Sequence, residues 1–177
     1  MALRAGRFAL EGRITLRTSR DGLAAQAGHD LTIGVSRWSG ELVIGSDLAP
    51  TSLDARMDLG SLVVQAGTGG IKPLTDRDKR EIIATARKVL SADQYREATF
   101  TATSFSPADD GGTIDGTFSL AGQSGPVRLE VHQTGPDRYR ATTTVRQTSF
   151  GIKPYSGFLG ALRVSDAVEV EADVVIR

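Results

Sequence analysis

His29 and Asp30 form the one adjacent pair of side chains that could work together as an acid and a base. Histidine titrates near neutral pH, and a carboxylate can orient its ring for proton transfer. Neighbours on a strand point to opposite faces, however, which favours a histidine at a turn or barrel rim that bonds to the backbone. A third interpretation places His29 at a tunnel mouth, donating to the polar head group of a ligand. The sequence leaves all three interpretations open.

The chain lacks the residues that most other catalytic and metal-binding sites require. The chain has no cysteine and only two histidines, which removes thiolate sites and argues against a multi-histidine metal site. Residues 122–125, Gly-Gln-Ser-Gly, do not match the Gly-x-Ser-x-Gly pattern of a serine nucleophile. Glu169 and Glu171 could contribute to a calcium site, but a solvated strand face is the favoured interpretation. We therefore expect no enzyme, no metal and no cofactor.

Acidic and basic residues balance, with 21 of each, and the two signs are interspersed along the chain. A nucleic-acid-binding protein carries a basic surface that neutralises phosphates, so this balance argues against a nucleic-acid partner. Arg4, Arg7 and Glu11 interrupt the first apolar residues, and no stretch approaches the roughly 20 apolar residues that span a bilayer. We expect one domain over residues 1–177 with no transmembrane segment, in the cytoplasm unless a leader has been removed.

Most of the chain alternates apolar and polar residues, the pattern of strands with one dry and one wet face. The last strand shows it most clearly, because Glu169, Glu171 and Asp173 stand between apolar residues. Strands are expected at 13–18, 30–37, 41–44, 52–59, 99–105, 113–120, 127–133, 138–148 and 168–176. Short turns between most of them favour antiparallel neighbours. The pattern predicts an all-β fold of two packed sheets or one closed barrel.

One helix is expected, over about residues 75–90. Thr75 and Asp78 form a variant of the capping box, and apolar residues such as Ile82, Ala86 and Val89 follow at helical spacing. A plug over an open barrel end is favoured over a partner-binding helix. The glycine-rich residues 66–70 before it are interpreted as a loop. They lack the Lys-Ser/Thr step of a phosphate-binding loop, so a nucleotide site is not expected.

The interior of such a barrel can be filled by side chains or can hold one ligand. The pattern alone favours an ordinary filled core. Small residues on the inward faces, such as Ala55, Ala102, Gly116, Ala141 and Ala172, would leave room instead. Residues 150–160, rich in glycine and aromatic residues, could form a lid over the barrel mouth or a packed loop under the helix.

Several weak motifs then occur in one order along the chain. They include residues 28–35, Trp38-Ser39-Gly40, Tyr95-x-x-Ala-Thr-Phe at 95–100, 116–122 followed by Pro-Val at 126–127, and Ser-Phe-Gly-Ile at 149–152. In this order, over residues 12–177, the chain resembles the YceI-like family of small bacterial lipid-binding proteins. The resemblance implies an extended, approximately eight-stranded antiparallel barrel similar to lipocalins, capped or flanked by the helix. It also implies a long apolar tunnel that binds a lipid without catalysis.

The expected partner is a long apolar lipid: an isoprenoid quinone, a polyisoprenoid or a fatty-acid-like chain. The expected tunnel lining is Ile14, Leu16, Leu31, Ile33, Val35, Leu53, Met57, Leu59, Phe100, Phe118, Leu120, Leu129, Val131, Phe150, Phe158, Val168, Val170 and Val174. His29 and Tyr155 are candidates for the mouth, where a head group would bind. The alternatives are an enzyme that uses His29 and Asp30 in a barrel pocket, and a filled barrel that serves as an interaction module. A homodimer fits any of these.

Overall fold

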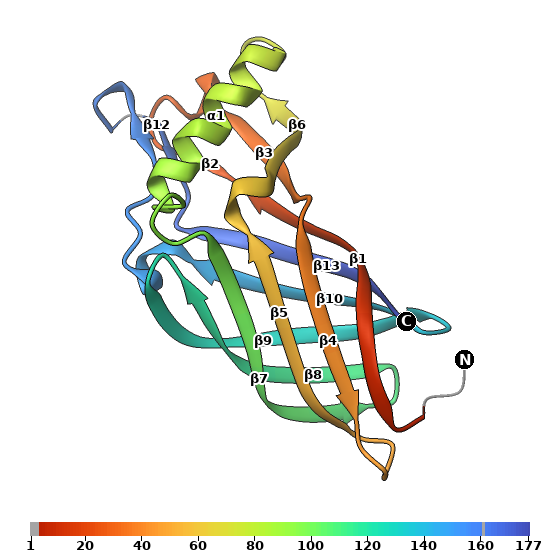
Figure 1. Cartoon of the computed structure of the whole chain (residues 1–177). Helices are drawn as coiled ribbons and strands as arrows, with labels where there is room; N and C mark the ends of the chain where they lie inside the picture. The colour runs from red at the N-terminus through yellow and green to blue at the C-terminus, as the bar shows by residue number, and fades with distance from the viewer. Residues whose placement is uncertain (1–3, 161) are drawn as a thin grey trace.

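Eight antiparallel strands close into a barrel in the order β1-β4-β5-β7-β8-β9-β10-β13, and β13 returns to pair with β1 (Figure 1). The computed structural model describes residues 4–160 and 162–177, apart from the Phe158 side chain. The barrel strands are β1 (Gly6–Thr18), β4 (Trp38–Ile44), β5 (Pro50–Asp58), β7 (Glu97–Ala108), β8 (Gly111–Leu120), β9 (Gln123–Gly135), β10 (Arg138–Arg146) and β13 (Ala167–Ile176). The closed eight-stranded barrel with one helix that the sequence predicts is confirmed.

The barrel wall continues past its closed part at one end. Strand β1 pairs with β4 through residues 6–10 and with β3 (His29–Val35) through residues 14–18. Strand β3 pairs in turn with β6 (Leu62–Gly69), which follows β5 after the short 3₁₀ helix η2 (Leu59–Ser61). Among the described strands, only β3 pairs with β6, so β6 is an edge strand whose outer edge pairs with no other strand.

The helix α1 (Asp76–Val89) lies against β6 at this extended end (Figure 1). The predicted capping box is present: the Asp78 backbone N–H donates to Thr75 Oγ1 at 3.2 Å, and the Thr75 N–H donates to Asp78 Oδ2 at 2.8 Å. None of residues 76–89 is buried, although one face is apolar. A helix with an unburied apolar face that packs on a sheet edge indicates empty space beneath it.

The expectation that residues 66–70 form a loop is wrong for most of that segment. These residues continue β6 as far as Gly69, where Gly69 pairs with His29 and Gly67 pairs with Leu31. Glycine is uncommon inside strands and often marks a close approach of other groups. A Cβ at Gly69 would overlap the Arg20 guanidinium, and a Cβ at Gly70 would overlap the His29 ring.

A second, three-stranded sheet lies at the same end and was not predicted from the sequence. It consists of β2 (Arg20–Asp21), β11 (Ser156–Gly157) and β12 (Leu162–Val164), with β12 in the middle. Short 3₁₀ helices η1 (Ala25–Ala27), η3 (Gln147–Phe150) and η4 (Phe158–Gly160) flank these strands. Strands of two or three residues are too short to show an alternating pattern, so the sequence could not reveal them.

Buried apolar residues form two clusters beside the interior rather than one central core. One cluster joins Ile14, Ile33, Val35, Leu62 and Val64 beneath the helix; the other joins Leu59, Ala92, Ala98, Leu120, Val145, Phe150 and Ile152. No described side chain reaches an exposed fraction below 2%. A filled core of this size would contain fully buried side chains, because protein interiors are close-packed.

Candidate functional site: an apolar tunnel through the barrel

The barrel encloses one long cavity of about 1080 Å³. Pockets for drug-sized molecules measure about 300–1,000 Å³, so this cavity exceeds the usual range. Inward side chains from all eight barrel strands line it, together with residues of β3, β6 and α1. Water needs two to four polar partners to be held in a cavity. The mostly apolar lining supplies few of these, so the interior suits an apolar guest.

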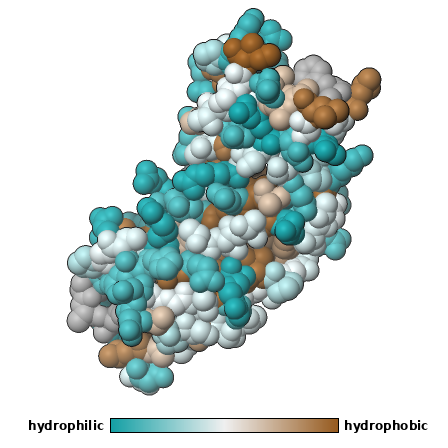
Figure 2. Space-filling view, turned by 180° about the vertical axis from the view of Figure 1, so that it is seen from behind, coloured by the Kyte–Doolittle hydropathy of each residue, from teal (hydrophilic) through white to brown (hydrophobic). Residues whose placement is uncertain are grey.

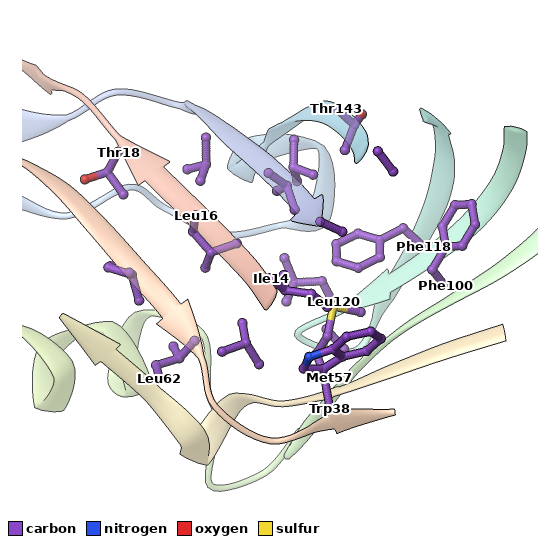
Figure 3. Close-up of a pocket in the computed structure, with 18 of the residues that line it drawn as sticks. Ile14, Leu16, Thr18, Trp38, Met57, Leu62, Phe100, Phe118, Leu120 and Thr143 are labelled. Atoms are coloured by element: carbon purple, nitrogen blue, oxygen red, sulfur yellow. The ribbon is translucent and has the colours of Figure 1, made fainter. Parts of the chain in front are cut away.

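The structure brings most of the predicted lining residues together around this cavity (Figure 3). They are Ile14, Leu16, Leu31, Ile33, Val35, Leu53, Met57, Leu59, Phe100, Phe118, Leu120, Leu129, Val131, Val168, Val170 and Val174. The interior is therefore hollow, and the filled core that the pattern alone favoured is wrong.

Two of the predicted lining residues stand apart. Phe150 is not among the described residues that line the cavity. It is buried in the cluster that contains Leu120 and Val145, and its ring packs edge to face on Phe118 with the centroids 5.4 Å apart. Phe150 therefore packs against residues that line the cavity without lining it. The Phe158 side chain lies outside the described part of the structure.

Two alanines on neighbouring strands account for part of the empty space. The strand register places Ala141 of β10 between Val131 of β9 and Ala172 of β13, and Ala172 lies opposite Ile14 of β1. Ala141 and Ala172 both face the cavity, so the wall is thin along this row. Gly116 leaves no such room, because the Phe100 ring lies against it.

The sequence analysis did not predict several other residues that line the cavity. Trp38 points into the middle of the cavity, near Met57 and Leu120 in Figure 3, and its Nε1–H donates to the Gly12 carbonyl oxygen at 3.2 Å. The α1 residues that line the cavity are Asp78, Glu81, Ile82, Thr85, Ala86 and Val89. The apolar spacing of the helix was visible in the sequence, but the sheet edge that needs a helical wall was not.

Thr143 and Gln147 are among the polar side chains of the mostly apolar lining. Gln147 is buried, and its Nε2 donates to the Ser165 carbonyl oxygen at 3.0 Å. This bond uses one of the two amide hydrogens and leaves the side-chain oxygen for another partner. Polar groups in apolar pockets fix the orientation of a ligand.

At the extended end of the barrel the cavity is lined by Arg20, His29, Lys72, Tyr155 and Arg163, and we call this end the mouth. His29 Nε2 lies 2.8 Å from the Lys72 carbonyl oxygen. Because a carbonyl oxygen only accepts, Nε2 must carry the hydrogen, and Nδ1 remains for another partner. His29 and Tyr155 thus lie at one end of the cavity, where the sequence analysis placed them.

His29 and Asp30 do not work as a pair in this structure. His29 lines the cavity, whereas the Asp30 carboxylate accepts from the Arg20 backbone N–H at 2.9 Å on the other face of β3. A carboxylate near the His29 ring is Asp78, whose pKa is held below its usual range by hydrogen bonds from Thr75. The orienting role that the enzyme interpretation gives to Asp30 is therefore not supported.

The carboxylates of β13 lie on the outer wall. Arg140 Nε is 2.8 Å from Asp173 and 3.9 Å from Glu171, and these partners raise the pKa of Arg140, with the Asp173 hydrogen bond as the main cause. Within the described residues, no group of three or more His, Cys, Asp or Glu side chains could hold a metal ion. The last strand therefore keeps an ion-paired outer face and an apolar inner face.

An antiparallel barrel closed around an apolar tunnel is a lipocalin-like fold. A family model described as the YceI-like domain matches residues 13–176, so the chain belongs to the YceI-like family. This family is associated with the binding of polyisoprenoids and other lipids, and its members are generally non-catalytic.

Solved structures show the same fold at low sequence identity. BcnA of Burkholderia cenocepacia is 15% identical, with a TM-score of 0.63 over 93% of this chain and 95% of that one. The Campylobacter jejuni YCEI protein is also 15% identical, with a TM-score of 0.56 over 80% of this chain and 83% of that one. No curated protein matches the sequence. None of the helices in the described residues is long and apolar enough to cross a membrane.

Proposed function

We propose that this protein binds a long apolar lipid, such as an isoprenoid quinone, a polyisoprenoid or a fatty-acid-like chain, and carries it without chemical change. The observation that supports the proposal most directly is the cavity of about 1080 Å³ with its apolar lining. Membership of the YceI-like family supports it independently.

The shape of the cavity favours a chain over a compact ligand. Along β1 the lining runs from Leu10 to Thr18. Eight steps at about 3.3 Å each give about 26 Å along the strand, or about 20 Å along the axis of a barrel with the usual tilt. Each buried methylene contributes about 0.8 kcal/mol, so a long chain can be bound by contact with apolar walls alone.

The polar end of the lipid would lie at the mouth. His29 Nδ1 can accept a hydrogen bond there, the Tyr155 hydroxyl can donate or accept one, and Arg20, Lys72 and Arg163 are positively charged. The rest of the cavity has few partners for a charged group, and an unpaired buried charge is costly. The lipid would therefore enter with its chain first and keep its head group near His29.

Native mass spectrometry of gently purified protein tests the proposal. A mass increment that is removed by organic extraction and identified as a lipid is the expected result. Protein that carries no lipid and gains none from phospholipid, quinone or fatty-acid mixtures would contradict it. The enzyme alternative predicts that His29→Ala abolishes a turnover while lipid affinity is retained. The proposed function predicts only that His29→Ala lowers the affinity for the head group of the lipid.

A further inference from the structure

Three large apolar side chains at the mouth point into solvent. Leu23 is 101% exposed, Ile71 is 79% exposed and Leu159 is 109% exposed. Soluble proteins carry scattered apolar surface residues, but a group of them beside a ligand cavity marks an interaction site. Figure 2 shows apolar residues protruding at this end of the molecule, and others along its middle and at the opposite end.

The topology places the three residues around one opening. Leu23 follows β2, and Leu159 lies in the turn between β11 and β12. Because β12 pairs with β2 through Arg163 and Asp21, both turns lie at the same end of the small sheet. Ile71 follows β6 and itself lines the cavity. The apolar wall of the tunnel therefore continues onto the outer surface through Ile71.

Packing does not explain the leucine at position 159. Its side chain is fully exposed, and its φ of 54° and ψ of 34° lie in the left-handed region, which is unfavourable for leucine. Leu48 at the opposite end of the barrel shares this conformation, so the position of Leu159 beside Leu23 on the small sheet, and not its backbone, carries the argument.

The charges at the mouth nearly balance. The carboxylates of Asp21 and Asp30 lie 4.0 Å from Arg163 and 3.7 Å from Arg20, respectively. Lys72, next to Ile71, has no ion pair among the described residues, and the Asp78 carboxylate near His29 brings an opposite charge to the same end of the cavity. The protruding apolar side chains, and not a net charge, would therefore supply the attraction to a bilayer.

We propose that the mouth docks on a lipid bilayer, with Leu23, Ile71 and Leu159 inserted among the acyl chains. The inference rests on the proposed function, since docking would let a lipid pass into the tunnel without crossing water. Single apolar side chains on three separate turns suit a fluid acyl layer better than a protein partner, whose hot-spot contacts usually form one packed central cluster.

Vesicle co-sedimentation tests this proposal, with phosphatidylcholine vesicles prepared with and without phosphatidylglycerol. The test variant is Leu23→Asn with Leu159→Asn. The matched variant at the opposite end of the barrel is Leu48→Asn, because Leu48 in the β4–β5 turn is also an exposed leucine in the left-handed region, with a φ of 62°, and also lines the cavity. The comparison therefore tests which end of the barrel docks. Asparagine tolerates this region, so Leu159→Asn and Leu48→Asn should fold normally.

We expect the double variant to bind vesicles about a hundredfold more weakly, about tenfold for each lost side chain, and Leu48→Asn to bind like wild type. Added salt should have a small effect, because apolar contacts dominate. Wild-type protein that fails to sediment with either vesicle, a double variant that binds like wild type, or an equal loss in Leu48→Asn would each overturn the proposal.

Native mass spectrometry of the same samples separates this proposal from the proposed function. If the protein carries lipid but does not bind vesicles, the docking proposal is wrong and the proposed lipid binding is unaffected. If the protein binds vesicles through its mouth residues but never carries lipid, the proposed lipid binding is wrong and the docking surface is retained. In the expected case, the double variant still carries lipid but exchanges it with vesicles more slowly than Leu48→Asn does.

Discussion

Replacing Ala141 with phenylalanine should narrow the tunnel without damaging the barrel. Ala141 faces the cavity beside Ala172, where two small residues leave the wall thin. In a packed core, such an overpacking change costs about 1–3 kcal/mol. Here the added ring points into space, so we expect the melting temperature to stay the same or to rise.

The same substitution should weaken lipid binding by an amount that the geometry bounds. If the ring displaces three methylenes of the bound chain, the loss is about 2.4 kcal/mol at about 0.8 kcal/mol each. At about 1.4 kcal/mol per tenfold, the affinity falls about fiftyfold. Titration with a fluorescent long-chain fatty acid measures this change, and native mass spectrometry reports the lipid that co-purifies.

Thr144→Phe is the matched control, because Thr144 lies on the same strand, faces outward and is exposed. It receives the same added bulk and should keep wild-type affinity. Wild-type lipid binding in Ala141→Phe, or a melting temperature lowered by several degrees in that variant alone, would refute the reasoning that a lipid-sized void lies beside Ala141.

Three further predictions concern the wall and the acid stability of the fold. Thr75→Ala removes the N-cap of α1 and should cost about 1 kcal/mol, seen as faster hydrogen exchange over the first helical turn. Gly116→Ala should lower the melting temperature and weaken ligand binding together, because the new methyl group would displace the Phe100 ring that lines the cavity. The backbone N–H and hydroxyl of Thr148 donate to Asp166 and lower the pKa of that carboxyl below its usual 3.8. A depressed carboxyl pKa stabilises the fold above pH 3.8 and ceases to do so as the pH falls through the lowered value. Asp166→Asn should therefore melt earlier than wild type at neutral pH, and thermal melts at decreasing pH should show this difference disappear; a difference that persists in acid would contradict the assignment.

The local sequence pattern predicted the elements that are specified by neighbouring residues alone. Alternation marked the barrel strands, and the Thr75–Asp78 cap with apolar spacing marked the helix, because each depends only on neighbouring residues. Strand β6 was missed, and its glycine-rich end was interpreted as a loop, because the strand depends on pairing with β3 and glycine by itself indicates a turn. The packing of Phe150 on Phe118 depends on η3, whose first two residues the sequence analysis assigned to the strand at 138–148.

The sequence by itself determined which face of each strand is apolar, since side chains alternate strictly along a strand. It therefore determined that residues such as Val170 point inward and Glu171 points outward. Only the tertiary structure decided whether the inward side chains fill the barrel interior or leave a cavity between them. That outcome depends on how wide the closed barrel is, and on a register that sets Ala141 beside Ala172, properties that arise from pairings between distant strands. The same pairings bring Leu23, Ile71 and Leu159 from three separate turns to one mouth, an arrangement that no local pattern records.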